Sequence, residues 1–185
     1  LFDCYRTSAI TIVPCGGPTD FFPPYRRMEG GEMAKWFRAR IKKLGLAKRW
    51  RIQTRESGLT ALENMLACRR SVKQGRLLYF CEKTREAKMR RLAREVFGNR
   101  ATVIGIEFDG SPPRYQVPER RGMEREDLKY GLLALKNPEW RKFLHRAAQE
   151  KIQVLRKTPP RVRAVEIDRI ARRIRQKYWE LFRAA

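Results

Sequence analysis

The sequence contains little of the chemistry that metal sites and enzymes usually need. It has one histidine, His145, in 185 residues, and its four cysteines include no C-x-x-C pair. Zinc sites are built mainly from Cys and His at such spacings, so none is expected. The chain also lacks the glycine-rich loops G-x-G-x-x-G and G-x-x-x-x-G-K-[ST], whose backbone approaches a nucleotide phosphate closely. We therefore predict a protein that is not an enzyme and that uses no cofactor, metal or small-molecule substrate.

Two weaker catalytic arrangements have simpler explanations. Cys81 ends an expected strand, and His145 would be its only possible imidazole base. Cysteine, however, is among the most frequently buried residues. Glu107 and Asp109 also follow an expected strand, as metal-binding carboxylates do in nucleases. Asp109 precedes a glycine, and Asp-Gly usually marks a turn. We favour the structural interpretation for both pairs.

Long apolar runs and acidic residues are both scarce. The longest apolar stretch, SAITIVPC, is too short to cross a bilayer, so no transmembrane segment is expected. The chain has 20 Asp and Glu against 43 Lys and Arg, a net charge of +23. Self-repulsion of this size opposes compactness, which points to a polyanionic partner, either nucleic acid or an anionic membrane. Arg outnumbers Lys, a ratio that suits phosphate recognition but that codon usage explains equally well.

The middle of the chain alternates expected strands with expected helices. Strands are predicted at 49–54, 76–81 and 101–108, and amphipathic helices at 57–70 and 84–97. The segment from 76 to 108 has the size of a βαβ unit with parallel strands. The predicted fold class is α/β, with a small three-stranded, mostly parallel sheet, flanking helices, an extended N-terminal arm and basic C-terminal helices.

Four segments are expected along the chain. Residues 1–31 form an arm rich in Pro and Gly, which lies either in grooves of a partner or against its own domain. Residues 32–110 form the basic α/β core, which begins with a helix at 32–44. Residues 111–123 form a loop, and residues 124–185 a helical extension.

Capping residues support several of these helix boundaries. Ser57, Thr84 and Asn137 stand where an N-cap side chain is expected. Gly98 stands where a helix should end.

The strongest functional signal is a run of positive charge. Residues 34–55 contain nine Lys or Arg and no Asp or Glu, together with Trp36, Phe37 and Trp50. Cations follow phosphates and aromatic rings stack on unpaired bases. Phe37 falls on the apolar stripe of the expected helix, which assigns it to the core, whereas the pattern does not decide the place of Trp50. The residues predicted to bind RNA are Lys35, Arg38, Arg40, Lys42, Lys43, Lys48, Arg49, Trp50, Arg51, Arg55, Lys88, Arg91, Arg169, Arg172, Arg173 and Lys177.

The spread of this charge favours RNA over DNA. A sequence-specific DNA reader concentrates its cations on one recognition element, whereas structured RNA presents phosphate on many sides. We expect a structural constituent of a ribosome that clamps ribosomal RNA and contacts neighbouring ribosomal proteins. The first residue is Leu, which would fit a cleaved leader and favours a mitochondrial ribosome in the matrix. The alternative is a supernumerary, non-catalytic subunit of a respiratory complex of the mitochondrial inner membrane, where cations would meet anionic lipid or acidic subunits.

Overall fold

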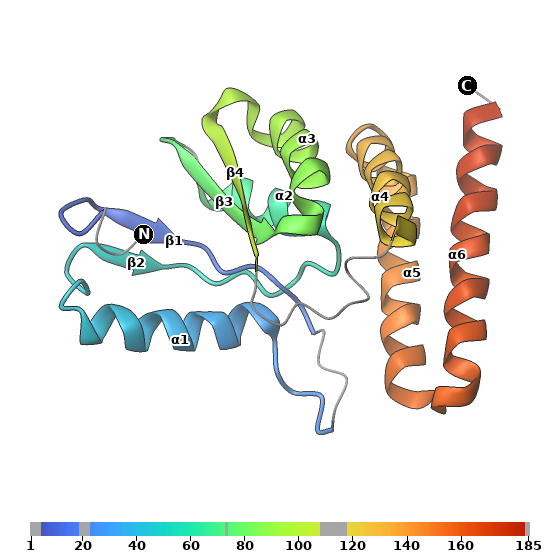
Figure 1. Ribbon diagram of the computed structural model, residues 1–185, viewed down its shortest axis with the longest axis horizontal. Helices are drawn as coiled ribbons and strands as arrows, with labels where there is room; N and C mark the ends of the chain where they lie inside the picture. Colours follow the sequence, from blue (N-terminus) through green and yellow to red (C-terminus); the bar gives the residue numbers. More distant parts are fainter. Residues whose placement is uncertain (1–4, 19–22, 73, 108–117, 184–185) are drawn as a thin grey trace. The chain divides into compact units, whose positions relative to one another are not determined.

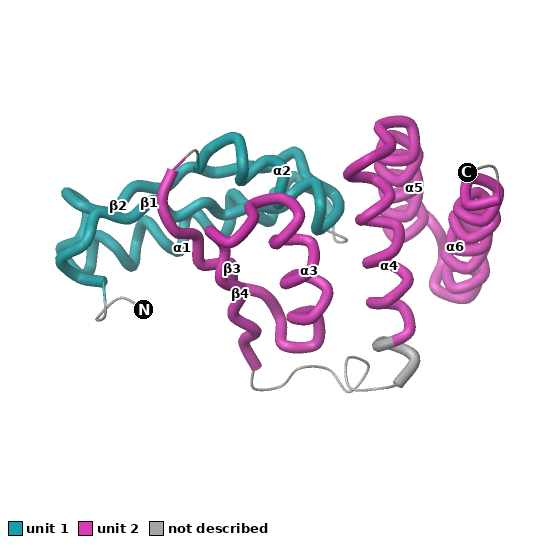
Figure 2. Tube along the Cα trace, turned by 90° about the horizontal axis from the view of Figure 1, so that it is seen from above, with its two compact units in different colours: residues 1–73 teal, residues 74–185 magenta. Residues whose placement is uncertain are grey.

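The structure, a computed structural model, describes residues 5–18, 23–72, 74–107 and 118–183, with the side chains of 118–121 excepted. The chain divides into two compact units, residues 1–73 and 74–185 (Figure 2). Over the described residues the fold is mixed α/β, with six α-helices and two two-stranded parallel sheets. The predicted α/β class is therefore confirmed.

Unit 1 is built around a βαβ arrangement near the N-terminus. Strand β1 (Ile10–Ile12) pairs in parallel with β2 (Trp50–Ile52), with Ile10 opposite Trp50. Helix α1 (Glu29–Lys43) connects the two strands in sequence and packs beside them (Figure 1). Helix α2 (Ala61–Ser71) follows. Strand β1 belongs to the segment expected as an arm, so this part of the arm packs on its own domain.

Glycine pairs allow the connection between β1 and α1 to pack closely. The backbone N–H groups of Gly16 and Gly17 donate to the carbonyls of Arg55 and Gly58, at 3.0 and 2.8 Å. The N–H of Gly30, in the first turn of α1, donates to the carbonyl of Gly16 at 3.0 Å. A Cβ atom on Gly30 would lie 2.9 Å from the carbonyl oxygen of Arg55, closer than such contacts allow. The glycines of this segment, on which the prediction of an extended arm was based, therefore allow the backbone of the segment to pack against the rest of unit 1.

A hydrophobic cluster joins α1 to the strands of unit 1. Ile41, Leu46 and Trp50 are buried at its centre, and Trp50 is only 3% exposed. Partly buried side chains from both strands, from α1 and from the turn after it pack around this centre, namely Ile10, Ile12, Phe37, Leu44 and Ile52. The apolar stripe of α1 thus covers the β1–β2 pair, as its spacing predicts.

Unit 2 begins with a second βαβ arrangement. Strand β3 (Leu77–Glu82) pairs in parallel with β4 (Ala101–Ile106) over its whole length. Helix α3 (Glu86–Phe97) lies between them in sequence, and short 3₁₀ turns precede and follow it. The buried face of α3 carries Met89, Leu92, Ala93, Val96 and Phe97. The parallel βαβ unit expected between 76 and 108 is confirmed.

The prediction of one three-stranded sheet is wrong. Strand β2 pairs with β1, and β3 pairs only with β4 in the described chain. The error has a physical cause, because β1 and β2 are three residues long and a strand of that length carries almost no periodicity of its own. Strand β1 lies within the apolar run SAITIVPC, which the expected fold left in the arm.

Helices α4 (Pro118–Lys136), α5 (Pro138–Lys157) and α6 (Pro160–Arg183) complete unit 2. The part of the expected 111–123 loop from 111 to 117 lies outside the described residues, and α4 already begins at Pro118. Helices α5 and α6 form an antiparallel hairpin (Figure 1). An aromatic cluster links all three helices, with the rings of Tyr130 and Tyr178 5.1 Å apart. Trp140, fully buried in this cluster, donates its indole N–H to the carbonyl of Tyr130 at 2.9 Å.

Two of the four expected helix boundaries are confirmed and two are wrong. Asn137 caps α5 through its side chain, and Gly98, with φ of 65°, ends α3. Thr60, rather than Ser57, caps helix α2, because Thr60 and Glu63 form a reciprocal capping box. Thr84 lies within the 3₁₀ turn before α3 and does not cap the helix.

The fold brings together two thiols that are far apart in sequence. Cys15 follows β1, Cys68 is buried on α2, and both are free. The hydrogen bond that Cys15 donates to Cys68, together with burial, raises the pKa of Cys15. Cys4, the cysteine nearest to Cys15 in the sequence, lies outside the described residues.

A buried ion pair connects α3 to α4 within unit 2. Lys88 and Glu124 are both about 8% exposed at their side chains and form a close contact, and Asp127 lies 3.2 Å from the same ammonium. Removing Glu124 would leave the buried Lys88 ammonium with the more exposed Asp127 as its remaining carboxylate partner in the described chain, so that most of its compensation is lost.

Replacing Glu124 with Ala should therefore lower the free energy of unfolding of unit 2 by about 3–5 kcal/mol, as for other buried pairs. The matched control is Glu95→Ala, which removes the exposed Arg91–Glu95 pair from the helix that carries Lys88 and should cost less than about 1 kcal/mol. Urea denaturation followed by circular dichroism measures both. Equal stability losses in the two variants would contradict a special contribution of the buried pair.

Candidate nucleic-acid interface

The residues expected to bind RNA lie on three elements: the α1–β2 segment, helix α3 and helix α6. In unit 1 they follow α1 toward its C-terminal end, where Arg40, Lys42 and Lys43 form the last basic turn. Cations at a helix C-terminus also interact favourably with the helix dipole, typically by about 0.3–1 kcal/mol each. This contribution helps the helix to tolerate its cations, and it does not remove their positive charge.

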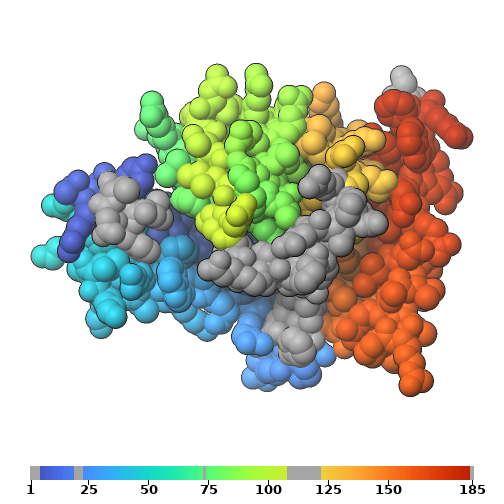
Figure 3. Space-filling view, viewed as in Figure 1, coloured from blue at the N-terminus to red at the C-terminus, as the bar shows by residue number. Residues whose placement is uncertain are grey.

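We define the α1–β2 cationic surface as the exposed cations of this segment: Lys35, Arg38, Arg40, Lys42, Lys43, Lys48, Arg49 and Arg51. Within the described chain, none of Arg38, Lys42, Lys43, Lys48 and Arg51 lies within ion-pair distance of a carboxylate. The α1 region, coloured light blue to cyan, forms an outer surface of unit 1 in the space-filling view (Figure 3).

Two members of this surface have contacts inside unit 1. Lys35 forms an ion pair with Glu32 at 2.7 Å, with both side chains largely exposed. Arg49 donates to the carbonyl of Thr7 at 3.2 Å, and therefore helps to hold the chain before β1. Both remain exposed, so neither contact prevents them from meeting a phosphate.

Two residues predicted to bind RNA are instead structural. Trp50 is buried in the unit 1 core, so its ring has no free face for a base. Arg55 is half buried and donates its Nε–H to the hydroxyl of Ser71 on α2 at 2.7 Å. Its backbone also bridges to Cys15. We exclude both from the candidate interface because their polar or aromatic groups already contact the protein.

Helix α3 offers fewer available cations than the sequence suggests. Lys88 is buried in its pair with Glu124, so we exclude it from the candidate interface. Arg91 is exposed but pairs with Glu95 at 3.1 Å.

A shallow, open hollow of about 610 Å³ follows the exposed side of α3. Lys83, Arg90, Arg91 and Arg94 line it together with Glu86, which pairs with Lys83 at 2.7 Å and with Arg90. The hydrogen bond from Lys83 lowers the pKa of Glu86, so this carboxylate stays ionised and offsets part of the positive charge.

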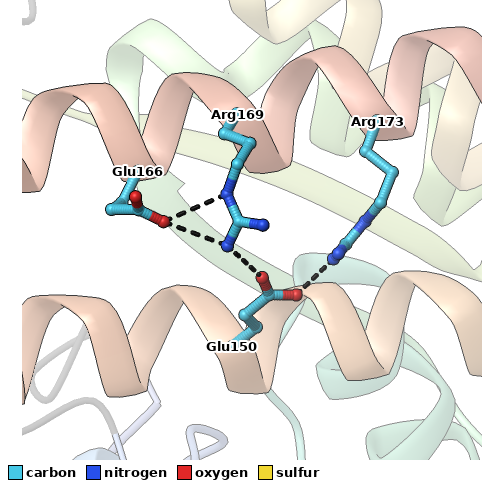
Figure 4. Close-up of polar contacts among 4 residues, drawn as sticks. All are labelled: Glu150, Glu166, Arg169 and Arg173. Atoms are coloured by element: carbon cyan, nitrogen blue, oxygen red, sulfur yellow. Dashed lines mark hydrogen bonds and ion pairs between the residues drawn. The ribbon is translucent and has the colours of Figure 1, made fainter.

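Several cations of α6 are paired with acids of unit 2. Glu150 on α5 contacts Arg169 at 3.2 Å and also contacts Arg173, so that one carboxylate joins two arginines (Figure 4). Arg172 pairs with Asp168 at 3.0 Å. Lys177 lies over the ring of Phe143, with its ammonium 5.6 Å from the ring centre. Exposed pairs of this kind can exchange partners, but their charge is already partly compensated.

We add Trp36 to the candidate interface, although it was not among the residues predicted to bind RNA. Its side chain on α1 is 59% exposed, and its ring meets the ring of Phe37 edge to face at 5.1 Å. Phe37 packs on the core cluster, which fixes the base of the exposed ring. Helical spacing could have predicted that Trp36 is exposed, because it lies outside the apolar stripe formed by Met33, Phe37 and Ile41.

The catalytic arrangements gain no support from the structure. Burial and the nearby Glu86 raise the pKa of the Cys81 thiol, which works against a thiolate nucleophile. No group of three His, Cys, Asp or Glu side chains in the described part of the chain is placed to hold a metal ion. Asp109 lies outside that part.

Comparisons with known proteins give no family assignment. No protein-family model matches the chain, and neither a curated protein nor a solved structure matches it significantly. Over the described residues, none of the helices has the length and apolar character needed to cross a bilayer.

The structural role of Arg55 can be tested against that of its exposed neighbour. Arg55→Met should lower the free energy of unfolding by about 1.5–3 kcal/mol, because it removes a charged hydrogen bond to a half-buried hydroxyl. Arg51→Met, on the exposed side of β2, should change it by less than about 0.5 kcal/mol. Thermal or urea unfolding measures both. If Arg51→Met proved the more destabilising variant, the assignment of the two residues would have to be reversed.

Proposed function

We propose that this protein is a structural RNA-binding component of a ribosome, and that the α1–β2 cationic surface is its main RNA contact. The single observation that carries the proposal is the cluster of exposed cations on α1, the following turn and β2, with no acid between residues 34 and 55. Neutralising such a cluster requires a partner with closely spaced negative charge, and the phosphate backbone of RNA supplies it.

The contrast between the units supports this choice of surface. In unit 2 many exposed cations already have a carboxylate partner on the same or a neighbouring helix, as Arg169 and Arg173 do through Glu150. Binding phosphate there must first displace or reorient an existing pair. On the α1–β2 cationic surface, Arg38, Lys42 and Lys48 have no such pair within the described residues. Phosphate binding at this surface therefore sacrifices less interaction energy of the free protein.

The proposed role is structural rather than catalytic. Contacts to folded RNA go mainly to phosphate, ribose and shape, which a surface of fixed cations can satisfy without a compact sequence motif. The setting that we propose is the mitochondrial ribosome, with neighbouring ribosomal proteins as the other partners. The mitochondrial location and the neighbouring ribosomal proteins are both proposed from the sequence. Subcellular fractionation tests the compartment independently of RNA binding.

The interface is tested by removing four cations of the α1–β2 cationic surface at once: Arg38, Lys42, Lys48 and Arg51, each replaced with Gln. The affinity for RNA should fall, and the slope of log K against log salt should become shallower by about 0.7–0.9 for each phosphate that the variant no longer neutralises. Filter binding or fluorescence anisotropy at several salt concentrations measures both quantities.

A matched variant removes the same total charge from unit 2. It replaces Arg91, Lys142, Arg169 and Arg172, all of which pair with acids, with Gln. The slope of log K against log salt should change less than half as much in this variant as in the variant of the α1–β2 cationic surface. Equal changes in the two variants would mean that net charge alone drives binding and would refute the assigned surface.

The ribosomal assignment needs a measurement on the native protein. Lysate from the source cells is sedimented through a sucrose gradient with and without RNase. The protein should travel with ribosomal particles and shift to light fractions when RNA is digested. Co-migration with detergent-solubilised respiratory complexes, unaffected by RNase, would overturn the proposal in favour of the membrane-complex alternative.

A further inference from the structure

We infer that the α1–β2 cationic surface recognises unpaired nucleotides, with Trp36 as the stacking platform for a base. This inference rests on the proposed RNA-binding function and adds which form of RNA the surface selects. The carrying observation is an indole ring that is 59% exposed in the middle of a cationic helix. A surface that only neutralised a duplex backbone would need cations and no exposed aromatic ring.

Trp36 lies on the same stripe of α1 as two exposed cations. Arg40 follows it by four residues and Lys43 by seven, spacings that place the three side chains along one side of a helix. At about 1.5 Å per residue, these cations lie roughly 6 and 10 Å further along the helix axis. Single-stranded nucleic acid is bound by this combination of stacking rings and adjacent cations that follow the backbone.

The ring is held in a defined place before any ligand binds. Phe37 meets Trp36 edge to face at 5.1 Å and packs on the cluster that contains Ile41 and Trp50. Helix α1 is fixed to β2 by the same cluster. A rigid aromatic side chain on a fixed helix loses little conformational entropy when a base stacks on it.

Charge complementarity favours a nucleotide over a protein as the occupant of this stripe. An apolar protein surface could also cover an exposed Trp, but Trp36 has no exposed aliphatic neighbours larger than Ala39 on the stripe toward Lys43. On that side of the ring the exposed groups are the cations Arg40 and Lys43, whereas Glu32, one turn before the ring, pairs with Lys35 at 2.7 Å. A base with its phosphates matches the ring and the cations at once.

The test compares two RNA probes on the full chain: a 12-nucleotide oligouridylate and an RNA duplex of 12 base pairs. Trp36→Ala should weaken binding of the single strand by about 5- to 150-fold, the range found for loss of one base–aromatic stack. Duplex binding should stay within about twofold. Trp36→Phe keeps an aromatic face and should retain most of the affinity for the single strand, which separates stacking from a folding defect.

Trp179→Ala is the matched control, because Trp179 on α6 is also about half exposed but lies in the other unit. It should leave single-strand affinity unchanged. Quenching of Trp emission by oligouridylate gives a second readout in a Trp179→Phe background, where Trp50 and Trp140 are buried. The quench should disappear when Trp36 is also replaced with Phe.

The outcomes separate this inference from the proposed function. If the wild-type protein binds neither RNA probe, the proposed function itself fails. If it binds both and Trp36→Ala weakens them equally or not at all, RNA binding stands and base stacking is refuted. Binding of polyglutamate that depends on Trp36 and exceeds that of oligouridylate would identify an acidic protein segment as the occupant and would also overturn the inference.

Discussion

The packing of Trp50 against Ile41 and Leu46 is the interaction on which the α1–β2 cationic surface depends. Neighbouring cations on α1 repel one another, at about 1 kcal/mol for a pair 4 Å apart in water and less at longer range. Burying one large aromatic side chain contributes about 4–6 kcal/mol, from 150–250 Å² at roughly 25 cal/mol per Å². The cluster can therefore hold together a helix and a strand whose exposed faces would drive them apart.

The two units balance their positive charge in different ways. Unit 2 has twice as many Lys and Arg as acids, but it places several of those acids between cations, as Glu150 lies between Arg169 and Arg173. It also buries one ion pair, Lys88 with Glu124, where the charge supports packing between helices. Unit 1 gathers its cations on α1 and β2 and keeps Glu29 and Glu32 at the opposite end of α1. The surplus of positive charge is therefore concentrated on one surface in unit 1, whereas in unit 2 nearby carboxylates offset part of it.

Much of this fold could be predicted from the sequence where periodicity is strong. Helix α3 and the parallel strands around it follow from an apolar stripe between two apolar runs. The partner of β2 could not be predicted, because tertiary contacts select the pairing of a three-residue strand. Among the residues predicted to bind RNA, the burial of Lys88 could have been predicted, since it precedes Leu92 and Val96 at four-residue steps and so falls on the buried stripe of α3. Its acidic partner, thirty-six residues further on, could not be identified without the fold.

The exposed Trp36 on α1 says more about ligand binding than the buried Trp50 on β2. Trp50 contributes its area to folding and is no longer available to a ligand. Trp36 meets the ring of Phe37 edge to face and is 59% exposed, so it remains available to a ligand. Because the core fixes α1 independently of any ligand, the ring and the cations beside it are already arranged before a ligand binds. Binding energy at this surface is then not spent on folding the helix that presents it.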